Sequence, residues 1–251
     1  MIEINNKLNN KYLIQQDGNQ NTDEENRLCK VASVYSLTEG AMVVLSCLRT
    51  NISHIYWGKV AETMDFDSSK SYQKVDSVWE EEIIERIHPD DWAIRNLQEL
   101  LFFRLSSLQT QPICVYPSHL EQTMRMADKN GGWHNILHRI FYFISDGKPG
   151  ISYVLCIYTI TDKLYQDAHM INTLTGEDKI LKVDDCHRFL SEREKNILIL
   201  IRKGLASKEI ADVLEISKHT VDRHRQNIIA KLQVNNATEA CHKAKLLGLI
   251  E

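Results

Sequence analysis

Helix start signals recur between residue 190 and the C-terminus at a spacing that leaves room only for short helices. Ser191 and Asn236 are each followed three positions later by glutamate, a pattern in which the two side chains cap a helix reciprocally. Ser217 is placed to start another helix, and Gly204 to end the first. These signals predict helices over 191–203, 207–214, 217–232 and 236–248. The tight turn at 215–216 makes the middle pair a helix-turn-helix.

The helix expected over 217–232 has an apolar face and a polar face. Val221, Ile228 and Leu232 recur at helical spacing and predict a buried stripe. The residues that point elsewhere include Asp222, Arg223, Gln226 and Lys231. Residues 188–251 carry a net charge of +4, whereas residues 1–187 carry −8. A basic outer face on the second helix of a helix-turn-helix suits the DNA major groove, and a solvated face of a helical bundle is the alternative.

Residues 190–250 resemble the LuxR-type DNA-binding domain over its whole length. The matching elements are Leu190-Ser191, Arg193-Glu194, Gly204-Leu205, Lys208-Glu209-Ile210-Ala211, Leu214, Ile216-Ser217, Thr220-Val221, His224, Asn227-Ile228, Lys231-Leu232, Val234, Asn236, Glu239-Ala240 and Gly248-Leu249-Ile250. The resemblance implies a transcriptional regulator that binds double-stranded DNA as a homodimer. It assigns DNA contact to Lys208, Thr220, Val221, Asp222, Arg223, His224, Gln226, Asn227 and Lys231. The family often pairs through its fourth helix, where Ala240, Cys241 and Ala244 permit close helix approach.

Several residues depart from the family pattern. Asp222 stands where lysine is usual, and two interpretations stay open: its carboxylate accepts a hydrogen bond from the N4 amino group of cytosine, or it supports Arg225 or Lys218. Ala206 replaces the usual serine cap of the second helix, so Ser207 is expected to cap one residue later. Two further changes are Gln233 where glycine is common and Ala237 where arginine is common.

The chain before residue 188 predicts an α+β domain. Helical spacing is read over 37–48 and 78–87, and Asp90 is expected to cap a helix over 91–108. Alternation predicts a strand at 52–58, and turn residues near 130–132 and 146–150 separate three long strands. A further hairpin is expected around Thr175-Gly176. The layout is an antiparallel sheet covered on one side by helices.

Residues 35–162 resemble a PAS domain in the stretches ISHIYWG, IHPDDW and GGWHNILHRIFYFISDGKPGISYVLCIYTITD. The resemblance implies a domain that senses a small molecule, docks a protein partner or controls dimerisation. Four segments follow: a flexible polar lead over 1–27, a PAS-like domain over 28–165, a hairpin and linker over 166–187, and the helix-turn-helix domain over 188–251.

Other classes of protein find little support in the sequence. No apolar run is long enough to cross a bilayer and no signal peptide is seen, so a cytoplasmic protein without membrane contact is expected. His134 and His138 share a strand face but lack a third ligand, so neither a metal nor a cofactor is expected. Phosphate-binding loops and nucleophile elbows are missing, so no enzyme is expected. The scattered cysteines at 29, 47, 114, 156, 186 and 241 are read as reduced thiols. The rival function is an adaptor whose helical tail docks to another protein.

Overall fold

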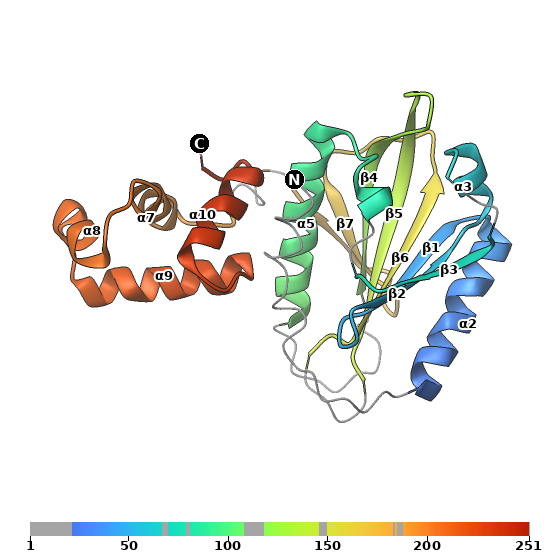
Figure 1. Cartoon of the computed structure of the whole chain (residues 1–251), viewed down its shortest axis with the longest axis horizontal. Coiled ribbons are helices and arrows are strands. Elements are labelled where there is room, and N and C mark those ends of the chain that lie inside the picture. Colours follow the sequence, from blue (N-terminus) through green and yellow to red (C-terminus); the bar gives the residue numbers. More distant parts are fainter. Residues whose placement is uncertain are drawn as a thin grey trace.

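The structure is a computed structural model that describes residues 22–66, 70–78, 81–107, 118–145, 150–182, 184 and 188–250. A sheet with helices on its faces occupies the N-terminal part, and a group of short helices follows at its side (Figure 1). This arrangement confirms the α+β architecture expected from the sequence. Among the described residues, no helix is both long and apolar enough to span a membrane.

The sheet has eight antiparallel strands in the order β3-β2-β1-β6-β5-β4-β7-β8. The strands are β1 (Met42–Cys47), β2 (Ile52–Tyr56), β3 (Tyr72–Val75), β4 (Ser118–Ala127), β5 (Trp133–Phe143), β6 (Tyr153–Ile160), β7 (Ala168–Asn172) and β8 (Asp178–Leu181). The three long strands β4, β5 and β6 lie close to the stretches where the sequence predicted them. The hairpin expected around Thr175-Gly176 is also present, and β7 pairs with β4, so this hairpin extends the sheet.

Helices cover both faces of this sheet (Figure 1). Helix α2 (Thr22–Glu39) packs Leu28 and Ala32 against Val43 and Leu45 on one face. The opposite face packs against α3 (Lys59–Thr63), α4 (Glu81–Ile84) and α5 (Pro89–Ser107). The sequence predicted helices on one side only, because the polar start of α2 was assigned to the flexible lead. Residues 22–27 are helical, and residues 1–21 of that lead lie outside the described residues.

The helix predicted over 37–48 is wrong: these residues end α2 and then form β1. Every residue of β1 is buried, because α2 covers one of its faces and the other core covers the second. A strand buried on both faces shows no alternation, so its apolar run fits a buried helix equally well. The short strand β3 was not expected, and α4 covers only part of the helix predicted over 78–87.

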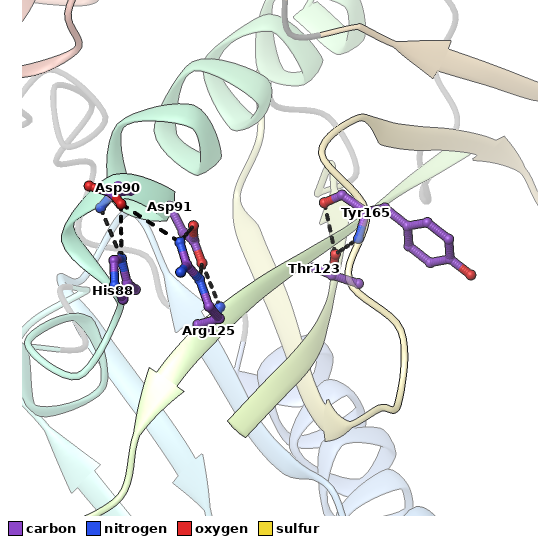
Figure 2. A network of polar contacts seen from close by, with 6 residues as sticks. All are labelled: His88, Asp90, Asp91, Thr123, Arg125 and Tyr165. Atoms are coloured by element: carbon purple, nitrogen blue, oxygen red, sulfur yellow. Dashed lines mark hydrogen bonds and ion pairs between the residues drawn. The ribbon is translucent and has the colours of Figure 1, made fainter. Parts of the chain in front are cut away.

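Helix α5 begins at Pro89, one of the few positions in a helix where proline is favourable. Asp90 therefore lies in the first turn and does not cap the helix as expected. The next residue, Asp91, reaches β4 instead, as Figure 2 shows. Its two oxygens accept hydrogen bonds from Arg125 Nε at 2.9 Å and from Arg125 NH2 at 2.6 Å. Burial opposes ionisation of Asp91, but these bonds outweigh it and leave the pKa of its carboxyl below the ordinary value.

The C-terminal helices are α7 (Glu192–Arg202), α8 (Ser207–Leu214), α9 (Lys218–Leu232) and α10 (Ala237–Leu246), close to the predicted ranges. Their buried side chains share one apolar core with Leu97 and Leu100 of α5. Helix α5 therefore contacts the core of the sheet on one side and the C-terminal helices on the other.

Candidate nucleic-acid interface

The turn between α8 and α9 sets the position of the helix that carries the candidate DNA contacts. Glu215 ends α8 in the left-handed conformation, at φ 54° and ψ 44°. Ser217 then caps α9, because its hydroxyl accepts a hydrogen bond from the Thr220 backbone N–H at 3.0 Å. The α9 cap was predicted from the sequence and is confirmed. Side-chain capping by Ser207 is wrong: Ala206 occupies the cap position of α8, and its N–H donates to Glu209 Oε2 at 2.7 Å.

Helix α9 separates an inner apolar stripe from an outer polar stripe. Val221, Ile228 and Leu232 are buried in the domain core, as their spacing predicted. Val221 is 0% exposed, so the expectation that its side chain contacts DNA is corrected. Arg223 and Gln226 lie on the exposed side of α9. Within the described part of the chain, Arg223 has no hydrogen bond or ion pair, which leaves its guanidinium free to contact a partner.

Asp222 is engaged inside the domain. The Lys218 ammonium lies 2.9 Å from Asp222 Oδ2, one helical turn away. Hydrogen bonds from Lys218 and Ser207 lower the pKa of the Asp222 carboxyl, and the nearby Arg225 charge acts in the same direction. Arg225 also donates to the Ser207 hydroxyl at 3.3 Å, which ties α9 to the start of α8. Asp222 thus pairs with Lys218, as one interpretation expects, and its contact with cytosine stays a prediction.

Lys231 is directed into the domain instead of outward. Its ammonium lies 2.7 Å from Glu194 Oε2, and the Glu194 side chain is only 4% exposed. Burial by itself raises the pKa of Glu194, but hydrogen bonds from Lys231 and Ser191 outweigh it, so this pKa lies below its ordinary value. The charge of Lys231 is thus used to neutralise a buried carboxylate that also completes the cap of α7.

The small residues of α10 face the core of their own domain. Ala240 and Ala244 are 0% exposed and Cys241 is 7% exposed, and the Cys241 thiol lies 3.5 Å from the Leu198 carbonyl oxygen of α7. They permit close helix approach, as predicted, but the approaching helix is α7 of the same chain. In this structure their side chains do not offer a surface to a second copy.

The other candidate residues lie at or near the surface. Lys208 of α8 and Asn227 of α9 are exposed, and Thr220 and His224 are partly buried. His219 was left out of the candidate set although it is exposed. Its spacing of four residues from Arg223 and seven from Gln226, one and two helical turns, was the signal that could have included it.

A helix-turn-helix whose second helix presents a polar side outward is typical of one class of DNA-binding domain. Residues 188–244 match the family described as "GerE: Bacterial regulatory proteins, luxR family". This C-terminal domain is a LuxR-family helix-turn-helix domain.

Individual proteins similar to this chain include two response regulatory proteins. The chain is 35% identical over 92 residues to the uncharacterized response regulatory protein YgeK of Escherichia coli, a match covering 37% of this chain and 56% of YgeK. It is 40% identical over 74 residues to the response regulator protein VraR of Staphylococcus aureus, covering 30% of this chain and 35% of VraR. A solved structure of the transcription factor GerE is 33% identical over 25% of this chain and 94% of its own, with a TM-score of 0.25.

These matches are partial. The chain spans about half the length of YgeK and about a third of that of VraR. The family match covers residues 188–244, and the matches to YgeK and VraR, over 92 and 74 residues, are longer than this range.

Proposed function

We propose that the protein is a transcriptional regulator that binds double-stranded DNA in a sequence-specific manner through α9. The observation that carries this proposal is the outer stripe of α9, where His219, Arg223 and Gln226 are exposed opposite the buried stripe. Arginine and glutamine pair in bidentate fashion with guanine and adenine edges in the major groove. The N-terminus of α9 adds backbone N–H groups and a positive helix end that suit a phosphate.

The sheet domain has a regulatory part in this proposal. We assign a PAS-like role to residues 28–165, the control of DNA binding through a small molecule, a protein partner or dimerisation. Support comes from the position of α5, which packs against both cores, so a change at the sheet face reaches the DNA-binding helices through one element. A ligand shifts such an equilibrium only if it binds one arrangement more tightly. A cytoplasmic, non-enzymatic protein is part of the same proposal.

Selection from random duplex DNA with the full chain tests the main proposal. A recovered consensus sequence supports base recognition by α9. Binding of the consensus is then measured over a range of salt concentrations, because each phosphate contact releases counterions and steepens the salt dependence. Failure to enrich any sequence, together with no binding at low salt, overturns the proposal.

The alternative is a protein-interaction adaptor whose helical tail docks to another protein. A single observation favours it: Val213 on α8 is 58% exposed, close to the start of α9. An apolar docking contact weakens little with salt, whereas phosphate contacts weaken steeply. The same salt titration, carried out with DNA and with any captured protein, separates the two functions.

A further inference from the structure

Asp222 is the single acidic residue of α9. The helix otherwise carries positive charge, at Lys218, Arg223, Arg225 and Lys231. In the proposed function this helix lies close to phosphates, which repel a carboxylate and so lower the affinity for every sequence. Asp222 is therefore unfavourable for DNA binding unless it contributes to the choice of sequence.

Asp222 lies in the part of α9 that is suited to contact base edges. It is in the second turn of the helix, and the N-terminal residues of a recognition helix are the ones that reach bases in the major groove. It directly precedes Arg223 and lies one turn before Gln226, both of which are exposed. The Asp222 side chain is itself 38% exposed. A groove that receives Arg223 and Gln226 is therefore within reach of the Asp222 carboxylate.

The groups around Asp222 keep its carboxylate charged and leave it able to accept another hydrogen bond. Lys218 Nζ lies 2.9 Å from Asp222 Oδ2. Hydrogen bonds from Lys218 and Ser207, together with the charge of Arg225, hold the pKa of the carboxyl below its ordinary value. An ionised carboxylate has about four acceptor positions and no proton to donate. Any further partner of Asp222 must therefore be a hydrogen-bond donor.

Pairing with Lys218 does not by itself account for the presence of Asp222. The Lys218 side chain is 64% exposed, and ion pairs between exposed side chains contribute little to stability because water solvates both charges. Nor is Asp222 required to connect α9 to α8, since Arg225 donates a hydrogen bond to the Ser207 hydroxyl at 3.3 Å.

The major groove offers few donors to a side chain that can only accept. The N4 amino group of cytosine and the N6 amino group of adenine donate there, whereas guanine and thymine present acceptors. Adenine also carries the N7 acceptor beside its amino group, and this lone pair repels the second oxygen of a carboxylate. Cytosine has no acceptor next to N4 in this groove. A carboxylate is therefore most favourable beside cytosine.

We propose that Asp222 selects a cytosine at one position of the DNA site by accepting a hydrogen bond from its N4 amino group. Lys218, one turn earlier, keeps its positive charge beside the carboxylate and offsets the repulsion from neighbouring phosphates. Rejection of guanine and thymine adds to the selectivity, because specificity is a difference between affinities. This inference rests on the proposed function and adds to it one base and the residue that recognises it.

Selection from random duplex DNA, carried out in parallel with the full unchanged chain and with Asp222→Asn, is the first test. We expect the unchanged chain to enrich cytosine at one position. Asp222→Asn should change that preference to adenine, because an asparagine amide pairs with N6 and N7 of adenine. Asp212→Asn is the matched control, since it removes the same charge from an exposed residue of α8 and should leave every position unchanged.

Lys218→Met distinguishes base recognition from a purely structural ion pair. If Asp222 acts only through Lys218, removing either partner has the same effect on base preference. The proposal instead expects Lys218→Met to bind all sequences more weakly while cytosine stays preferred. Loss of the cytosine preference in Lys218→Met, to the same extent as in Asp222→Asn, overturns the proposal.

Removal of the amino group from the DNA tests the contact itself. A duplex with 2-pyrimidinone in place of the preferred cytosine lacks the N4 amino group at that position. We expect the unchanged chain to bind this duplex about tenfold more weakly, and Asp222→Ala to bind the two duplexes equally. Such coupling between a change in the protein and a change in the DNA identifies a direct contact. Equal losses for the two proteins overturn the proposal.

The outcomes separate this inference from the proposed function. A consensus sequence that Asp222→Asn leaves unchanged contradicts the role of Asp222, and sequence-specific binding through α9 still holds. Failure of the unchanged chain to enrich any sequence contradicts both.

Discussion

At the scale of single residues, Lys231 has a structural role that its position on α9 did not suggest. Lys231→Ala leaves Glu194 buried without its cation, so we expect the free energy of unfolding to fall by about 1–3 kcal/mol. Urea unfolding followed by circular dichroism measures this. Glu194→Gln added to Lys231→Ala should recover part of the loss, because an amide needs no cation. Equal stability of Lys231→Ala and the unchanged chain would contradict the role.

The same carboxylate predicts a pH dependence. The folded pKa of Glu194 is below its ordinary value of 4.5, so the stabilisation is fully present above that pH. It is lost as the pH falls through the lower folded value, because the unfolded chain then binds a proton first. Unfolding curves between neutral and acid pH should show this loss, and Glu194→Gln should show less of it.

Gln233 closes α9 in a conformation that suits glycine. It has φ 53° and ψ 57°, the left-handed region, and its side-chain Oε1 is buried without a hydrogen-bond partner among the described residues. We expect Gln233→Gly to raise the free energy of unfolding by about 1 kcal/mol, since glycine adopts this conformation without steric cost. Gln233→Ala is the control, because alanine keeps the Cβ. Similar gains for both variants would show that backbone conformation is not the cause.

At the scale of elements, the outer stripe of α9 should decide sequence preference. Arg223→Ala is expected to flatten the preference at one base position, at a cost of about 1–3 kcal/mol for the preferred base. Competition binding with every base at each consensus position measures the effect. Lys179→Ala, which removes an exposed positive charge from β8, should leave the ranking of bases unchanged. A uniform loss for Arg223→Ala across all sequences would instead assign Arg223 to phosphate.

At the scale of the whole molecule, α5 joins the two domains, and Lys243 of α10 lies at this junction. Burial lowers the pKa of Lys243 to about 8, with the charge of Glu99 on α5 acting in the opposite direction. Between pH 8 and the ordinary value of 10.5, the unfolded chain binds more protons than the folded chain. Stability should therefore rise with pH in that range, and this group should make no pH-dependent contribution well below pH 8.

Lys243→Met tests the junction. This variant should be more stable than the unchanged chain at neutral pH and should lack the rise toward alkaline pH, as measured by calorimetric melting temperature. Lys245→Met is the matched control, because Lys245 is exposed two residues further along α10 and should change neither property. An alkaline rise that persists in Lys243→Met would place its origin in another group.

Local signals were sufficient for the C-terminal helices. Ser191, Ser217 and Asn236 each cap a helix as predicted, because a capping hydrogen bond spans only three residues of chain. The long strands β4, β5 and β6 were predicted for a similar reason, since the turn residues that separate them act over a few residues of chain. The buried stripe of α9 also followed from spacing alone. In the candidate site, Arg223 and Gln226 are exposed, as this periodicity predicted.

The tertiary structure decided the contacts between residues that are distant in the sequence. Strand β1 could not be told from a helix until α2 and a second core covered its two faces. The sequence assigned Val221, Lys231 and the small residues of α10 to partners outside the chain. In the fold, Val221 lies in the domain core and Lys231 pairs with Glu194. Cys241 of α10 contacts Leu198 of α7. The sequence by itself determined where helices start and which face of each is apolar, because those interactions are local. Only the folded chain determined which polar or small side chains contact another part of the same molecule. Such contacts are set by packing, as in the pair of Lys231 and Glu194, which lie 37 residues apart in the sequence.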